Sequence, residues 1–331
     1  MYINLPPSVV VTVGASYAAI FDMEANIYAS IPKEWGEFLD SSQMFFYTYN
    51  KNMLIKNGNN EVLADRELIN FLIENQFGLV SDRIISFDRY HIGTWEIPFQ
   101  YETLLIDADS SESLNRTIAH LPKRQFARFT QIRLFYSPTI TEIDTICDLI
   151  VKNNYYNCDI VTNFNRNENV SGYYNNILLK YPYHLSKLIL MNSLTNADTY
   201  YPRLILNKRN LENCSLCGHV DRMMLSINID TYMKYYKGNT CLWKKISVDS
   251  NGEIKNCPSM NYSYGNIEKT DILKVLYDKQ YLFYSNIKKN QIKVCRDCEF
   301  RIFCTDCRFK ILNKNDIYSK PECEYNPFIK K

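Results

Sequence analysis

The chain reads CRDCEFRIFCTDC from Cys295 to Cys307, so four cysteines fall within one short stretch. Nine of the eleven cysteines lie from residue 214 onward, at Cys214, Cys217, Cys241, Cys257, Cys295, Cys298, Cys304, Cys307 and Cys323. Thiolates at such short spacings are typical metal ligands, because short loops can wrap several sulfurs around one centre. We therefore predict that these nine cysteines are metal ligands.

Composition and charge exclude several classes of protein. The 331 residues carry a net charge of only +2, which gives no electrostatic reason to expect nucleic acid or an anionic membrane as a partner. No apolar run approaches the ~20 residues of a membrane helix, and residues 1–16 lack the pattern of a secretion signal. We expect a cytoplasmic protein with reduced cysteines.

Basic residues are frequent around the cysteines of the C-terminal stretch. Asp297, Glu299 and Asp306 are interspersed among them, which favours a solvated surface over a binding patch. The basic residues are Lys288, Lys289, Lys293, Arg296, Arg301, Arg308 and Lys310.

Residues 1–100 read as a small winged-helix-like domain. Strand-like runs at 16–21 and 26–31 predict a hairpin, and Pro32 is suited to open a short helix. Asp65 is a plausible N-cap for a second helix that ends near Gly78. Such a unit is often a peptide-recognition module; the alternative is a packing domain without a ligand.

Residues 101–210 alternate strand and helix. This order implies parallel strands joined by right-handed crossovers, in a partial β/α barrel or an open α/β sheet. Asp107 and Asp109 lie at the end of the first strand, where they could line a site, and Asp109 could equally cap the next helix. The expected strands are 103–107, 130–136, 159–164, 187–191 and 203–206.

Residues 211–331 form the cysteine-rich part. Asn251-Gly252 predicts a hairpin between strands 246–249 and 253–256, which would bring Cys241 and Cys257 toward each other. Residues 271–290 read as a helix. Sulfur-only ligation suits either zinc or iron–sulfur clusters, so ligand chemistry alone leaves both open.

The spacing of the cysteines resembles one known family. The motifs are Asn239-Thr-Cys-Leu242, Ile254-Lys-Asn-Cys-Pro-Ser-Met260, Cys295-Arg-Asp-Cys-Glu-Phe-Arg301 and Cys304-Thr-Asp-Cys-Arg308. They resemble the SPASM domain, the auxiliary-cluster module of radical S-adenosylmethionine peptide maturases, and in particular the maturases of "grasp-with-spasm" systems. Cys304 and Cys307 are one residue closer together than is usual in the family.

The resemblance implies two [4Fe–4S] clusters, with zinc as the alternative. Cys295, Cys298, Cys304 and Cys323 would hold one. Cys241, Cys257 and Cys307 would hold the other, with a fourth ligand from Cys214 or Cys217. It also implies two partners, a precursor peptide and an ATP-grasp ligase.

The cysteines of a radical centre are missing. A radical S-adenosylmethionine enzyme of this family has Cys-x3-Cys-x2-Cys after its first barrel strand, whereas this chain has Ala108-Asp-Ser-Ser-Glu112. Cys147 and Cys158 are too far apart to form the motif, and we expect them to be buried core residues. We therefore expect no S-adenosylmethionine and no conventional radical enzyme.

The sequence thus predicts an iron–sulfur protein that binds a ribosomally made precursor peptide and acts with an ATP-grasp ligase, in delivery, as a scaffold or in electron transfer. Two alternatives remain open. One is a peptide-modifying enzyme that uses an open iron site of an auxiliary cluster, and the other is a zinc-stapled interaction protein.

Overall fold

The computed structural model describes most of the chain: residues 2–39, 45–48, 53–56, 60–63, 66–83, 85, 94–164, 170–193, 197–198, 202–212, 225–311 and 313–329. The chain divides into two compact units, each built from separate stretches. Unit 1 comprises Met1–Trp95, His219–Thr240 and Ile287–Lys331, and unit 2 comprises Glu96–Gly218 and Cys241–Asn286. The three domains predicted at 1–100, 101–210 and 211–331 stay a prediction.

A mostly parallel sheet forms the centre of unit 2. Its eight strands are, in spatial order, β13 (Ala197–Asp198), β14 (Leu204–Leu206), β12 (Leu185–Met191), β11 (Cys158–Asn163), β10 (Ala127–Leu134), β9 (Tyr101–Ala108), β15 (Lys245–Val248) and β16 (Ile254–Lys255). Only the two outermost pairs are antiparallel. The predicted α/β class and the parallel pairing of the five expected strands are confirmed.

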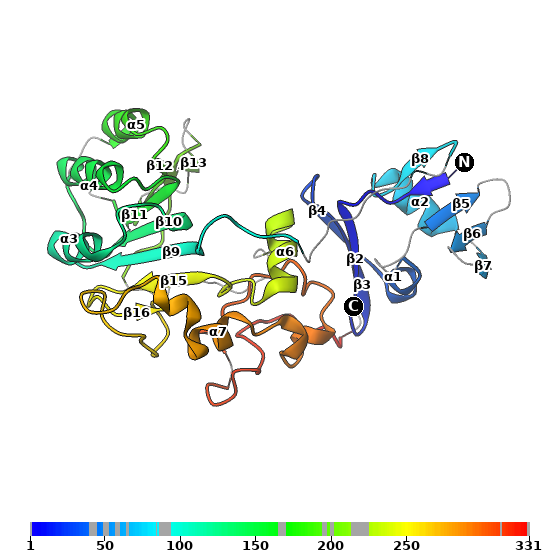
Figure 1. The fold of residues 1–331 in the computed structure, drawn as a ribbon. Coiled ribbons are helices and arrows are strands. Elements are labelled where there is room, and N and C mark those ends of the chain that lie inside the picture. Colours follow the sequence, from blue (N-terminus) through cyan, green and yellow to red (C-terminus); the bar gives the residue numbers. More distant parts are fainter. Residues whose placement is uncertain are drawn as a thin grey trace. The chain divides into compact units, whose positions relative to one another are not determined.

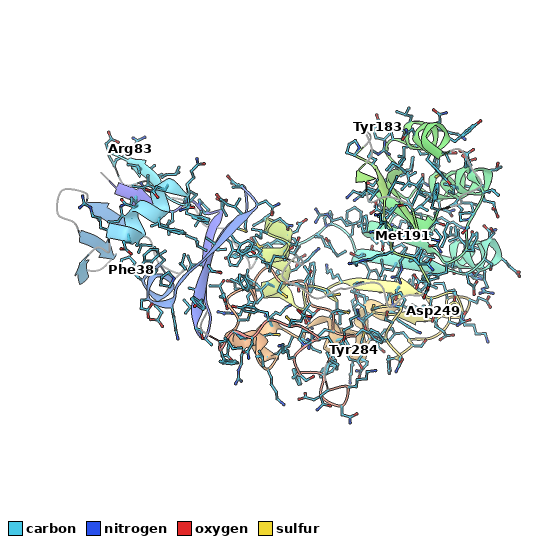
Figure 2. The ribbon with its side chains drawn as sticks, turned by 180° about the vertical axis from the view of Figure 1, so that it is seen from behind. Phe38, Arg83, Tyr183, Met191, Asp249 and Tyr284 are labelled. Carbon is cyan, nitrogen blue, oxygen red and sulfur yellow. The ribbon has the colours of Figure 1, made fainter. Side chains whose placement is uncertain are left out.

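Three helices cover one face of this sheet. They are α3 (Ser111–His120), α4 (Ile140–Lys152) and α5 (Val170–Lys180), which lie on the same side of the strands in Figure 1. Strand side chains alternate between faces, so Leu104, Ile132 and Leu188 all point into the core that these helices close. Neighbouring strands follow chain order from β9 to β12 with their helices on one side, as in β/α barrels.

The cysteine-rich hairpin extends the same sheet. Strand β15 pairs in parallel with β9, and β16 then pairs with β15 as predicted. Gly252 in the turn has a φ of +84°, which glycine adopts without strain. The single helix predicted over 271–290 is wrong. A 3-10 turn, η4 (Lys274–Tyr277), is followed by Asp278, which caps the separate helix α7 (Lys279–Ser285).

Unit 1 contains the N-terminal strands. β2 (Val9–Val13), β3 (Tyr17–Asp22) and β4 (Ile27–Pro32) form an antiparallel sheet, which confirms the predicted hairpin. Helix α1 (Lys33–Leu39) follows Pro32 as expected, and α2 (Arg66–Glu74) is the second predicted helix. Its predicted cap, Asp65, lies outside the described residues. Two further small sheets pair β1 (Tyr2–Asn4) with β8 (Leu79–Ser81), and β5 (Phe45–Thr48) with β6 (Met53–Lys56) and β7 (Asn60–Leu63).

A second core joins these strands to the cysteine-rich end. Phe21 of β3 contacts Phe303, with ring centroids 4.6 Å apart, and Ile227, just before α6 (Ile229–Lys237), is buried in the same cluster. Burial of these apolar side chains is the main force holding the segments together. Among the described residues, no helix has the length and apolar character needed to span a membrane.

Candidate metal centre

Four cysteines of unit 1 line one cavity of about 40 Å³. They are Cys295, Cys298, Cys304 and Cys323, the four residues that the family resemblance assigns to one cluster. The cavity is larger than one water molecule requires. Within the described part of the chain, no three His, Cys, Asp or Glu side chains converge closely enough to hold a single metal ion.

Short backbone turns place the first three of these cysteines. The amide of Cys298 donates to the carbonyl of Cys295 at 3.1 Å, and the amide of Cys304 donates to that of Phe300 at 3.0 Å. Cys295 opens the 3-10 turn η6 (Cys295–Asp297). The residue before it, Val294, has a φ of +69°, a strained conformation for a β-branched residue that is often kept at functional sites.

Arg308 positions the segment that carries the fourth cysteine. Its Nη1 donates to the carbonyls of Ile317 and Ser319, at 3.0 and 3.1 Å. A β-bridge between Ile311 and Pro321 continues this contact. These interactions fix the loop just before Cys323, although that residue lies far along the chain from the dense cysteine block.

A fully buried group of three charges lies beside the cavity. Asp306 accepts from Lys289 and, at 2.8 Å, from Nε of Arg308. All three residues are at most 2% exposed. The prediction of a solvated basic face is therefore wrong for Lys289 and Arg308, because their charges are paired inside the protein, whereas Lys293 and Arg296 are exposed as expected.

The environment of the thiols opposes their ionisation when no cation is bound. Burial raises the pKa of Cys295 to about 12, and the nearby Asp306 adds to this. Burial also raises the pKa of Cys298 and Cys304, although Lys289 opposes the shift at Cys304. Iron would supply the positive charge that converts such thiols to thiolates, with release of protons.

The donor set fits an iron–sulfur cluster. Four thiols with no nitrogen or oxygen ligand are the usual protein ligands of such clusters. The cavity is also lined by the cations Lys289, Arg301 and Lys320, and by no carboxylate of a described residue. A thiolate-ligated cluster is anionic, so this lining suits its charge.

Of the remaining predicted ligands, those that the structure describes do not line this cavity. Cys241 and Cys257 are in unit 2, with Nζ of Lys245 3.7 Å from Sγ of Cys241, and Cys257 is buried. Cys307 is buried in unit 1. Cys214 and Cys217 lie outside the described residues, so the composition of the second set stays a prediction.

Among the described cysteines, six are free thiols: Cys147, Cys158, Cys295, Cys298, Cys304 and Cys323. Cys147 and Cys158 are 1% and 0% exposed in the core of unit 2, which confirms the expectation that they are core residues.

Comparison with known families identifies the hairpin and the cysteine block. Residues 240–299 match the family model of SPASM, described as an iron-sulfur cluster-binding domain. Residues 240–299 are a SPASM domain. The match includes Cys241, Cys257, Cys295 and Cys298, and it ends before the last three cysteines of the chain.

Comparisons of the whole chain with curated proteins and solved structures do not identify a function. No curated protein matches the chain. A crystal structure of Streptococcus suis SuiB is similar with 11% identity and a TM-score of 0.41, over 97% of this chain and 100% of that one. The structure of SuiB bound to the precursor peptide SuiA has 10% identity and a TM-score of 0.32, over 97% and 99%. At such low TM-scores, no conclusion about this chain rests on either likeness.

Only Asp109 and Ser110 separate the end of β9, where the radical cysteines would follow, from the start of helix α3. Ser110, not Asp109, caps helix α3 and accepts from the amide of Ser113 at 3.2 Å. Asp107 is buried in a two-point ion pair with Arg133, at 2.6 and 2.8 Å. Burial raises the pKa of Asp107, and Arg133 opposes this. Asp107 is thus held by a structural partner.

Sequence reasoning missed Lys289, Asp306 and Arg308 as residues of the site. Lysine and arginine near a cysteine block are usually surface residues, and only the fold shows that these two are buried. One available signal was the Cys-Thr-Asp-Cys-Arg order, which places a carboxylate and a guanidinium beside two ligand candidates.

Proposed function

We propose that this chain is an iron–sulfur protein that binds the precursor of a ribosomally synthesised peptide and acts on it together with an ATP-grasp ligase. It would deliver or hold the peptide, or pass electrons through its clusters. The observation that carries the proposal is the cavity lined by four thiols, two of which fall within the SPASM domain.

The proposed ligand sets are those of the family resemblance. Cys295, Cys298, Cys304 and Cys323 would hold one [4Fe–4S] cluster, and their common cavity supports this set. Cys241, Cys257 and Cys307, with Cys214 or Cys217, would hold a second. A bound cluster supplies one-electron chemistry. The four thiols would hold the cluster, and Lys289, Arg301 and Lys320 would set the charge around it.

Residues 1–100 would act as the winged-helix-like domain that recognises the peptide. Strand β4 has a strand neighbour on one side only among the described residues, and Ile27, Tyr28 and Ser30 on it are exposed. An exposed edge strand can accept an extended peptide as an additional strand. We therefore assign the leader of the precursor to the free edge of β4.

The direction of the backbone groups on β4 follows from its register. Gly14 donates to the carbonyl of Tyr17 at 2.8 Å, so Tyr17 directs its backbone groups toward β2 and not toward its β4 partner, Pro32. Antiparallel pairs alternate in hydrogen bonding, so Ser30, two residues away, also has its N–H directed away from β3. That N–H is available to an added strand.

The free edge and the thiol cavity belong to the same unit. Tyr28 of β4 packs edge-on against Phe300, with ring centroids 5.8 Å apart, and Phe300 lies between Cys298 and Cys304 in the chain. A peptide added to β4 would therefore lie next to the segment that carries the cluster ligands, which suits a protein that presents a peptide or passes electrons near it.

Metal analysis tests the cluster part of the proposal. Protein purified without oxygen should contain iron and acid-labile sulfide, with the broad visible absorption of [4Fe–4S] clusters. Stoichiometric zinc without iron would contradict it and favour the zinc-stapled alternative.

A binding measurement with the cognate precursor tests the peptide part. Ser30→Pro removes the outward N–H and should weaken binding about fivefold, since one net hydrogen bond is worth about 1 kcal/mol. Ser30→Ala keeps the N–H and is the matched control. If the peptide does not bind, with or without the ligase, the delivery role is wrong.

A further inference from the structure

Lys289, Asp306 and Arg308 form a buried group with an excess of one positive charge. The carboxylate of Asp306 is paired with both cations, and the side chains of the three residues are at most 1% exposed. Nζ of Lys289 also donates to the carbonyl of Cys304 at 2.8 Å. One carboxylate balances only one of the two cations, and an unbalanced charge in a protein interior costs free energy.

Two observations show that this charge is directed to the cavity. Lys289 lines the cavity together with the four cysteines. In addition, Nη2 of Arg308 is buried without a hydrogen-bond partner among the described residues. Backbone carbonyls and one carboxylate satisfy the other groups, so an anionic partner is what this arrangement still lacks.

We propose that the Lys289–Asp306–Arg308 group is a fixed counter-charge for the cluster in the four-cysteine cavity, which stabilises its reduced, more negative state. This inference rests on the proposed cluster. Reduction adds one electron from an external reductant such as dithionite, and no proton needs to move. A buried positive charge next to the cluster lowers the energy of the added electron, because the interior screens it weakly.

Charge variants test this by potentiometric titration followed by electron paramagnetic resonance. Lys289→Met removes the excess charge and should lower the reduced-to-oxidised ratio at a fixed potential about tenfold, which for one electron is about 59 mV. Asp306→Asn adds to the excess and should shift the ratio the opposite way. The double variant keeps one net positive charge and should return toward the unmodified protein.

Controls separate charge from loss of structure. Lys289→Arg keeps the charge and should keep the potential. Lys293→Met removes an equal charge from a side chain that is 68% exposed. It should change the potential little, because water screens that charge. Cys298→Ala identifies the signal that belongs to this cavity, because that signal should disappear or change.

The outcomes distinguish this inference from the function on which it rests. A protein without iron would contradict both the counter-charge and the proposed iron–sulfur function. A protein with iron whose potential is unchanged in Lys289→Met and Asp306→Asn, or shifts the same way in both, would overturn only the counter-charge. If Lys289→Met does not fold, the comparison of Asp306→Asn with the double variant still decides the question. The inference requires a higher potential in Asp306→Asn, and equal potentials would overturn it.

Discussion

Gly14 and Glu299 meet so closely that a Cβ atom on Gly14 would lie 2.8 Å from both the amide nitrogen and Oε2 of Glu299. The amide of the next residue, Ala15, donates to the carbonyl of Asp297 at 2.7 Å. Nη1 of Arg301 donates to the carbonyl of Val13, also at 2.8 Å. The turn between β2 and β3 is thus in direct contact with residues 297–301, which lie within the cysteine block.

Gly14→Ala should destabilise unit 1 by about 1–3 kcal/mol, because the new methyl group overpacks against a backbone amide that cannot move aside freely. Urea unfolding followed by circular dichroism measures this. Ala25→Ser, at an exposed position in the turn between β3 and β4, is the control and should be nearly neutral. Equal stability of both variants would show that the close approach is not required.

Cys298→Ala should lower the iron content of anaerobically purified protein, since it removes one of the four thiols of the cavity. Cys147→Ala, which removes a buried thiol from the core of unit 2, should leave the iron content unchanged. Iron and sulfide analysis measures both. Full iron content in Cys298→Ala would exclude this cysteine as a required ligand.

Asp107 and Arg133 should behave as a coupled pair. Asp107→Leu and Arg133→Met should each cost about 3–5 kcal/mol, because each leaves the partner charged and buried. The double variant should cost less than the sum, since it leaves no unpaired charge. A double-mutant cycle in urea measures the coupling, and strictly additive costs would contradict it.

Asp159 should make stability depend on pH. Burial raises its pKa to about 6, Lys187 opposes the shift, and Oδ1 is buried without a hydrogen-bond partner among the residues that the structure describes. The folded state therefore binds this proton more tightly than the unfolded state, so stability falls as pH rises from about 4 to 6.

Asp159→Asn should remove that loss. It should change stability little near pH 4 and raise it by about 1–3 kcal/mol above pH 6, because a shift of one pKa unit corresponds to about 1.4 kcal/mol. Urea unfolding at pH 4, 5, 6 and 7 measures the profile. A gain that does not grow with pH would contradict the shifted pKa.

Local features of the fold were predictable because they depend on neighbours in the chain. The alternation of strands and helices from 101 to 210, the 3.6-residue stripe through Ile143 and Ile146, and the glycine turn at Gly252 each specify an element by themselves. The prediction of one helix over 271–290 was wrong because it rested on apolar periodicity. It did not take account of Asp278, whose side chain caps a new helix at that position.

The set of Cys295, Cys298, Cys304 and Cys323 came from the resemblance of the cysteine motifs to the SPASM domain, and the four residues do line one cavity. Lys289 could not be assigned in this way. A lysine is buried or exposed according to which segments pack over it, and those are distant in the chain.

The amino-acid sequence by itself determined the class of the protein: a parallel α/β region without radical-centre cysteines, followed by a sulfur-rich SPASM segment. The tertiary structure decided which segments share a core. It paired β15 with β9, and it packed the turn at Gly14 against Glu299. It also buried two cations around one carboxylate. Spacing along a chain fixes local geometry, but burial and the pairing of charges depend on long-range packing.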